Sequence, residues 1–132
     1  MITEIGRTTL LVDDYDDAIE FYTDTLGFEV LYDDELEDGY RAVHIGRSER
    51  SSVGIWLMEP VGEDERALVG QQTGDQPAFV FYTDDCRGTY ETLSDRGVTF
   101  LGEPTSDEGS VHVHFEDLYG TKIVLAEVAD SA

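Results

Sequence analysis

The sequence predicts an α+β fold that contains two copies of one βαβββ module, and three observations support this prediction. The expected elements occur twice in the same order, over about residues 4–59 and again over about 77–128. The segment LLVDDYDDAIEFYTDTLGFEV in the first half is echoed by VFYTDDCRGTYETLSDRGVTF in the second. Apolar residues alternate along most of the expected strands, which indicates sheets with one buried face. We expect one domain, over residues 1–132, whose curled mixed sheet surrounds a cavity.

The first module begins with an expected strand over residues 4–12. Asp14 then has the chemistry of a helix N-cap, and apolar residues at helical spacing predict a helix over about 15–26. Gly27 stands where helices commonly end in a left-handed residue. Three further strands are expected over residues 28–32, 40–46 and 52–59.

A polar, Gly-rich stretch over residues 60–76 is typical of a linker. The second module follows with a strand over 77–83 and a helix that Asp84 or Asp85 caps and Gly97 ends. Its remaining strands are expected over residues 98–101, 110–116 and 121–128.

Alternation along these strands separates two faces. The apolar face, expected to pack against the helices, comprises Leu10, Val12, Val43, Ile45, Ile55, Leu57, Phe79, Phe81, Val111, Val113, Phe115, Ile123 and Leu125. The opposite face mixes polar, aromatic and small residues: Arg7, Thr9, Tyr40, Ala42, His44, Trp56, Met58, Ala78, Tyr82, His112, His114, Lys122 and Val124. A face that is neither a uniform core nor a uniform solvent surface suggests a cavity.

The charge balance is strongly acidic, with 30 Asp and Glu against 8 Lys and Arg and a net charge of −22. Such a chain repels itself at low salt, which favours a salt-rich cytoplasm such as that of a halophile over an ordinary acidic surface. So few cations cannot form a basic patch for nucleic acid. The chain has one cysteine, no signal-peptide pattern and no apolar stretch of membrane-spanning length, so we expect a soluble cytoplasmic protein.

Two segments resemble a known family. TTLLVDDYDDAIEFYTDTLGFEVLYD, with Phe21-Tyr22 followed by Leu26-Gly27-Phe28, is similar to the opening module of the vicinal-oxygen-chelate (glyoxalase/bleomycin resistance/extradiol dioxygenase) superfamily. HFEDLYGTKIVLAE resembles the last hairpin of that superfamily, so the resemblance covers about residues 4–128. It implies a curled sheet around a cavity, where the enzymes of the family hold a divalent metal through His, Gln or Glu.

The resemblance places the four metal-ligand positions on Arg7, Trp56, Ala78 and Val124. Arginine stays protonated and only donates, and the other three side chains offer no suitable lone pair. A divalent ion needs three or four converging N or O donors. We therefore expect neither a metal nor another cofactor, and this weakens the expectation of the metal-dependent activities of the family.

The expected mixed face supplies the candidate ligand-binding residues, namely Arg7, His44, Trp56, Tyr82, His112 and His114. Within the repeat, His44 is expected to correspond to His112, so that the two imidazoles line opposite walls of one cavity. The histidines suit a binding wall, a role as polar residues without chemistry, or catalysis or a metal site at a new place. Arg7 suits an anionic ligand or a salt bridge to one of the many carboxylates.

The leading functional hypothesis is a metal-independent small-molecule binding protein of the bleomycin-resistance type. The alternative is a lyase, isomerase or dioxygenase-like enzyme of the same superfamily that acts on a small oxygenated substrate through its cavity histidines or Arg7. A third possibility is a structural module with a vestigial cavity. The apolar residues of the mixed face lead us to expect a homodimer, and neither nucleic acid nor a membrane is expected as a partner.

Overall fold

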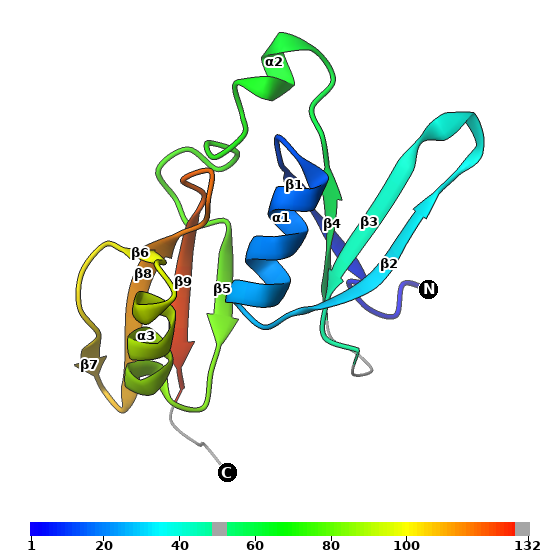
Figure 1. Ribbon diagram of the computed structural model, residues 1–132. Coiled ribbons are helices and arrows are strands. Elements are labelled where there is room, and N and C mark those ends of the chain that lie inside the picture. The colour runs from blue at the N-terminus through cyan, green and yellow to red at the C-terminus, as the bar shows by residue number, and fades with distance from the viewer. Residues whose placement is uncertain (49–52, 129–132) are drawn as a thin grey trace. The chain divides into compact units, whose positions relative to one another are not determined.

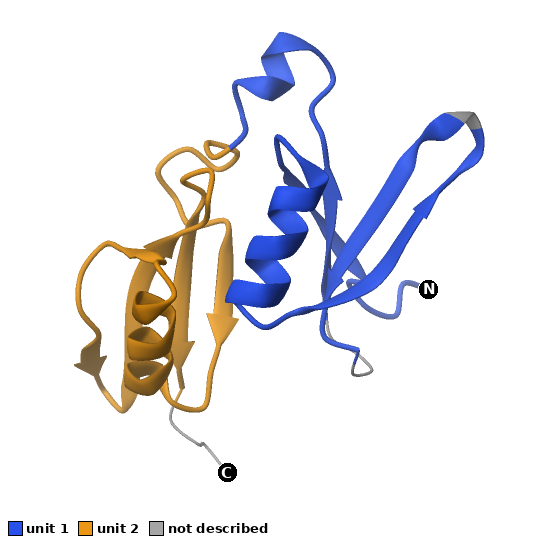
Figure 2. Cartoon of the chain, in the orientation of Figure 1, with its two compact units in different colours: residues 1–69 blue, residues 70–132 orange. Residues whose placement is uncertain are grey.

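The computed structural model describes residues 1–48 and 53–128, and the chain divides into two compact units, 1–69 and 70–132 (Figure 2). Unit 1 contains β1 (Arg7–Leu11), α1 (Tyr15–Ile19), the π-helix η1 (Glu20–Thr25), β2 (Glu29–Glu35), the 3-10 helix η2 (Glu37–Gly39), β3 (Arg41–Gly46), β4 (Gly54–Met58) and α2 (Gly62–Arg66). Unit 2 contains β5 (Phe79–Tyr82), α3 (Cys86–Asp95), β6 (Thr99–Phe100), β7 (Thr105–Asp107), β8 (Ser110–Glu116) and β9 (Lys122–Glu127) (Figure 1).

The two sheets share one topology. The sheet of unit 1 has the order β1-β4-β3-β2, and that of unit 2 has the order β5-β9-β8-β6, with β7 also paired to β8. In each sheet the first strand runs parallel to the last strand of its module, and the remaining pairs are antiparallel. This repeated arrangement of strands around one main helix confirms the predicted α+β fold of two βαβββ modules.

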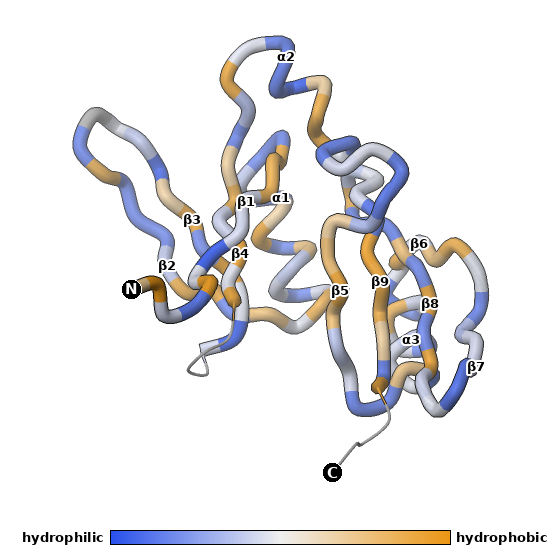
Figure 3. Tube along the Cα trace, turned by 180° about the vertical axis from the view of Figure 1, so that it is seen from behind, coloured by the Kyte–Doolittle hydropathy of each residue, from blue (hydrophilic) through white to orange (hydrophobic). Residues whose placement is uncertain are grey.

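The predicted apolar face forms the core of each unit. Leu10, Val43 and Leu57 in unit 1 are fully buried, as is Ile123 in unit 2, where Phe115 is 1% exposed. Phe79, Phe81 and Val111 of the predicted set are only partly buried. Figure 3 shows apolar residues along β5 and β9 and hydrophilic residues along α2. Alternation therefore identifies the buried face of both sheets, because successive strand residues point to opposite sides.

An aspartate caps the main helix of each unit. The Asp14 side chain accepts a 2.9 Å hydrogen bond from the backbone N–H of Asp17, and the Asp85 side chain accepts one of 3.0 Å from Gly88. Asp85, rather than Asp84, is thus the cap of α3. Each carboxylate satisfies an N–H group that has no partner inside its helix.

The first helix is not the continuous α-helix that the spacing predicts over 15–26. Gly27 follows its cap Asp14 by 13 positions, whereas Gly97 follows Asp85 by 12. The extra residue is accommodated in η1, where the Leu26 N–H donates to the Phe21 carbonyl five residues earlier. A π-helical turn absorbs one inserted residue without shifting the buried face on either side of it.

Other element boundaries also differ from expectation. The first strand begins at Arg7 rather than at residue 4, and β2 extends to Glu35 rather than ending at Tyr32. The predicted linker contains the short helix α2, and β7 was not expected. The start of the strand predicted from residue 52 lies outside the described residues, within which β4 begins at Gly54. Polar and Gly-containing segments hide short elements from pattern analysis because they lack an apolar period.

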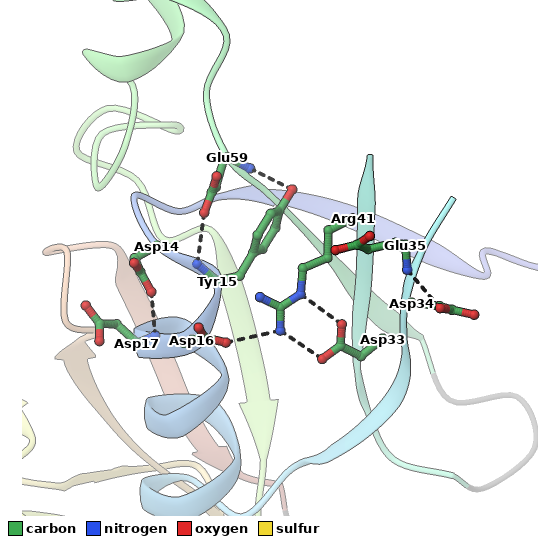
Figure 4. Close-up of polar contacts among 9 residues, drawn as sticks. All are labelled: Asp14, Tyr15, Asp16, Asp17, Asp33, Asp34, Glu35, Arg41 and Glu59. Atoms are coloured by element: carbon green, nitrogen blue, oxygen red, sulfur yellow. Dashed lines mark hydrogen bonds and ion pairs between the residues drawn. The ribbon is translucent and has the colours of Figure 1, made fainter. Parts of the chain in front are cut away.

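Arg41 ties the helix of unit 1 to its sheet on the core side (Figure 4). Its guanidinium donates to both carboxylate oxygens of Asp33 at 2.9 Å and to Asp16 on α1 at 3.1 Å. It also lies 5.4 Å from the centre of the Tyr15 ring. The Asp33 pKa is lowered, chiefly by this hydrogen bond. Arg41 thus holds α1 against the sheet, because its carboxylate partners Asp16 and Asp33 lie on α1 and β2.

Within residues 1–48 and 53–128, no helix is long and apolar enough to cross a membrane.

Candidate functional site

The open face of the unit 1 sheet carries a row of side chains across all four strands. This face is the one opposite the buried residues Leu10, Ile45 and Leu57, because side chains alternate along each strand. The strand registers pair Thr9 with Trp56, Trp56 with His44 and His44 with Tyr32. The sheet therefore brings residues from β1, β4, β3 and β2 into one line.

Arg7 crosses this face and contacts His44. The Arg7 Nε atom donates to His44 Nδ1 at 3.1 Å, and Nη1 donates to the Gly6 carbonyl oxygen at 2.8 Å. The side chain passes over Gly54 of the intervening strand, where a Cβ atom would lie 2.9 Å from Arg7 Cδ and 3.0 Å from Nε. Glycine at position 54 thus leaves the space through which Arg7 reaches β3, a common use of glycine within a strand.

The contact fixes the protonation state of His44. Because Nδ1 accepts from Arg7, the proton of the neutral imidazole belongs on Nε2. Burial, and then the charge of Arg7, lower the His44 pKa below its ordinary value. At neutral pH His44 is therefore an uncharged ring that presents an Nε2–H donor.

Three aromatic rings stand side by side on the same face. The centres of Tyr32 and His44 lie 5.7 Å apart, and those of His44 and Trp56 lie 5.1 Å apart. Tyr32 is 42% exposed. The Trp56 Nε1–H is shielded from solvent and has no hydrogen-bond partner among the described residues. A buried donor without a partner costs about 1–3 kcal/mol, so this N–H is a place where an acceptor would be stabilising.

A β-bulge places Tyr32 beside His44. The register between β2 and β3 shifts between Val30, which pairs with Ile45, and Tyr32, which pairs with His44. The extra residue is Leu31. In an unbroken antiparallel register, Leu31 rather than Tyr32 would pair with His44.

In unit 2, His112 and His114 line a cavity of about 330 Å³ together with Leu101, Gly102, Glu103, Thr105 and Val113. The two rings lie 6.2 Å apart, and His112 Nε2 is 3.4 Å from the Thr105 hydroxyl oxygen. The cavity lies where β6 and β7 both pair with β8 and the chain between them, 101–104, arches beside that strand. Both histidines thus share a wall, as their spacing of two predicts.

Tyr82 lies on the edge strand β5 and is 76% exposed. The registers place Ala126 between it and His112, so the two side chains are separated by two strand spacings, roughly 10 Å. Tyr82 therefore does not contact the histidine cavity directly.

The strand registers correct the expected correspondence between His44 and His112. His44 pairs with Trp56, which pairs with Thr9, and in unit 2 His114 pairs with Val124, which pairs with Val80. His44 therefore occupies the position of His114. Counting along the sequence alone missed this because the two hairpin connections differ in length. That His44 and a histidine of unit 2 line opposite walls of one cavity stays a prediction.

The residues at the metal-ligand positions implied by the family do not fit a metal ion. The Arg7 guanidinium is a cation that only donates, and the Trp56 indole offers a donor rather than a lone pair. Ala78 and Val124 carry no ligand atom. In the part of the chain that the structure describes, no three His, Cys, Asp or Glu side chains are grouped so that they could hold an ion.

The fold defines a class of protein: a chain of two βαβββ modules, each with one sheet face packed on its helix and one open face. The chain belongs to the Glyoxalase/Bleomycin resistance protein/Dioxygenase superfamily, whose model matches residues 4–125. It is 31% identical to an uncharacterized protein of Shewanella frigidimarina over 98% of this chain and 97% of that protein. It is also 31% identical to the uncharacterized protein YetH of Bacillus subtilis, over 96% of this chain and all of YetH.

Solved structures agree with this assignment. UcmS2 superposes with a TM-score of 0.82 and 30% identity, over 96% of this chain and 98% of UcmS2. TnmS3, an antibiotic-binding protein from Streptomyces sp. CB03234, superposes with a TM-score of 0.78 and 23% identity, over 97% of this chain and 98% of TnmS3. The TnmS3 match shows that the fold is shared.

The sequence prediction included Arg7, His44 and Trp56 but omitted Tyr32 and Gly54 from the candidate site. Gly54 had a usable signal, since a glycine at the start of an otherwise apolar strand often marks the close approach of another group. Tyr32 had none, because the bulge that brings it to His44 leaves no mark in the alternation. The alternative role of Arg7, a salt bridge to a carboxylate, is not found among the described residues, with none of which Arg7 makes an ion pair.

Proposed function

We propose that this protein binds a small organic molecule without the help of a metal ion. The observation that carries the proposal is the face of unit 1, where a position that the family uses for a metal ligand holds Arg7, bonded to His44. Such a face offers hydrogen-bond donors beside aromatic rings, the usual composition of a small-molecule site. TnmS3 shows that a protein of this fold binds an antibiotic, which is consistent with a binding role for this chain.

The cavity that His112 and His114 line is a second candidate binding site. Tyr82, on the same face of unit 2, is a candidate for contact with a part of the ligand outside this cavity. These three residues complete the proposed ligand-binding set with Arg7, His44 and Trp56. The acidic composition and the exposed apolar residues of the sheets, such as Val80 and Tyr82, support the further proposals that the protein works at high salt and as a homodimer.

The Arg7 contact distinguishes binding from proton transfer at His44. A general base needs a free lone pair, but the Nδ1 lone pair of His44 accepts from Arg7 and its Nε2 carries the proton. His44 is therefore suited to donate a hydrogen bond to a ligand rather than to remove a proton from one.

Two measurements on the full chain test the proposed function. Elemental analysis after purification without chelators should find no stoichiometric divalent transition metal. A thermal-shift screen of small carboxylates and aromatic compounds at two pH values should find compounds that raise the melting temperature with concentration, as mass action requires. One ion per chain held by side chains of the sheet faces, or a screen in which no compound responds, would overturn the proposal. Repeating the screen with His112→Ala shows whether the cavity of unit 2 contributes.

A further inference from the structure

The face of unit 1 holds a cation, Arg7, that no carboxylate among the described residues neutralises. The chain has 30 Asp and Glu against 8 Lys and Arg, so most cations should meet an acid. Arg41, on the core side of the same sheet, meets two. Arg7 makes no ion pair with any described residue, and its polar contacts there are an imidazole nitrogen and a backbone carbonyl. Both are neutral, so no described residue neutralises the positive charge of Arg7, which favours an anionic ligand.

The neighbouring groups are also donors. The orientation imposed by Arg7 leaves the Nε2–H of His44 as the hydrogen-bonding atom of that ring. The Nε1–H of Trp56, on the ring beside it, lacks an acceptor within the described chain. The Arg7 guanidinium and the His44 Nε2–H favour a ligand that only accepts, and a carboxylate is such a group.

The rings around these donors favour a flat ligand. The rings of Tyr32, His44 and Trp56 follow one another across three strands. Their neighbouring centres are 5.7 Å and 5.1 Å apart. The exposed part of Tyr32 is a surface on which an aromatic ring can stack. A ligand that unites a negative charge with an aromatic ring would use the donors and the rings together.

From this arrangement we propose that the face formed by Arg7, His44, Trp56 and Tyr32 binds an aromatic carboxylate. The proposal rests on the proposed function and names the class of its ligand. The carboxylate accepts from the Arg7 guanidinium and from His44 Nε2, while the aromatic ring of the ligand packs against Tyr32 and Trp56. Gly54 is a positioning residue, because it leaves the space through which Arg7 reaches the site.

Isothermal titration of the full chain with 1-naphthoate tests the proposal. Two further compounds separate the parts of the ligand: 1-naphthamide keeps the rings without the charge, and cyclohexanecarboxylate keeps the charge without the aromatic ring. We expect 1-naphthamide to bind at least about tenfold more weakly than 1-naphthoate, since it loses charge-assisted hydrogen bonds. We expect cyclohexanecarboxylate also to bind more weakly, since it loses the aromatic contacts with Tyr32 and Trp56.

Variants locate the binding. Arg7→Met should weaken 1-naphthoate binding by about tenfold or more and leave 1-naphthamide binding within about twofold. Gly54→Ala should weaken 1-naphthoate similarly, because the added methyl group meets the flexible end of Arg7 rather than the backbone. Arg66→Met removes a cation from α2, outside the site, and should leave binding within about twofold. Unfolding curves should show that Gly54→Ala remains folded.

The outcomes separate this proposal from the more general one. Equal binding of 1-naphthoate to wild type and Arg7→Met, or equal binding of 1-naphthoate and 1-naphthamide, would overturn the assignment of an aromatic carboxylate. If aromatic carboxylates fail while other compounds in the thermal-shift screen bind, this inference falls and the proposed function stands. If no compound of any class binds, both fall.

Discussion

The open faces of the two sheets differ sharply although the sheets share one topology. In unit 1, Arg7 on β1 stands beside Gly54 on β4. At the equivalent place in unit 2, Ala78, which directly precedes β5, stands beside Lys122 on β9. The cation therefore lies on the first strand in unit 1, as Arg7, but on the last strand in unit 2, as Lys122. In unit 1, Arg7 reaches across the sheet to His44. In unit 2, the methyl group of Ala78 is too short to reach the equivalent residue, His114.

The comparison teaches that the two modules share their core and differ on their open faces. The core positions match between the units, for instance Leu57 with Leu125 and Ile55 with Ile123. The open positions match at His44 and His114 but differ beside them: Trp56 corresponds to Val124, and Thr9 to Val80. Burial constrains the first group in both units, whereas the second group lies on the open faces, where burial imposes less. The predictions that follow test whether the two units are alike in their cores and different on their open faces.

The largest effect is expected from the matched core leucines. Leu57→Ala and Leu125→Ala remove side chains that are 0% and 4% exposed from the central strands β4 and β9. Each should lower the free energy of unfolding by about 2–5 kcal/mol, through lost burial and the cavity left behind. Urea unfolding of both variants measures this. A cost below about 1 kcal/mol for either leucine would show that the two cores are not equivalent.

Ionic strength should stabilise the whole chain and act more on unit 1. Of the net charge of −22, residues 1–69 carry −13 and residues 70–132 carry −9. Screening of this repulsion should raise the melting temperature steeply between low and molar salt. Hydrogen exchange followed across the same salt series should show the larger gain in protection in unit 1. An unchanged melting temperature would contradict the proposal of a high-salt setting.

The helix caps should show equal and smaller effects. Asp14→Ala and Asp85→Ala each remove one side-chain acceptor from a first-turn N–H. Each should cost about 1 kcal/mol of stability. Thermal unfolding of the pair measures the difference, and Asp→Asn variants at both positions, which keep an acceptor, should recover most of the loss. A loss of stability from only one of the two Asp→Ala variants would contradict the expectation that the two caps are equivalent.

The smallest effect concerns the pH dependence of His44. Its pKa in the folded protein lies below the ordinary value of about 6.5, so the unfolded chain binds more protons between the two values. The contribution of neutral His44 to the free energy of unfolding is therefore fully present above about pH 6.5. It is lost as the pH falls from there through the lowered pKa. Urea unfolding of wild type and His44→Asn at about pH 7.5 and pH 5 should show a smaller loss on acidification in the variant. An equal loss would show that His44 is not perturbed.

The sequence could predict what depends on local periodicity. The period of two identified Leu10, Val43 and Leu57 as core, and it placed Arg7, His44 and Trp56 together on the other face. The contact between Arg7 and His44 could not be predicted, because it depends on strand register, the gap at Gly54 and the path of a long side chain. The bulge at Leu31 and the π-turn in η1 each add one residue without changing the apolar pattern. For that reason Tyr32 was missed, and the helix appeared continuous.

The protonation of His44 tests the account most directly, because the contact with Arg7 organises the open face of unit 1. ¹⁵N NMR of the imidazole nitrogens in the full chain distinguishes which nitrogen carries the proton. The account predicts a neutral ring at neutral pH, with the proton on Nε2 and a hydrogen-bonded, unprotonated Nδ1. Arg7→Met should abolish the hydrogen-bond shift at Nδ1. A proton on Nδ1, or a charged ring at neutral pH, would contradict the account.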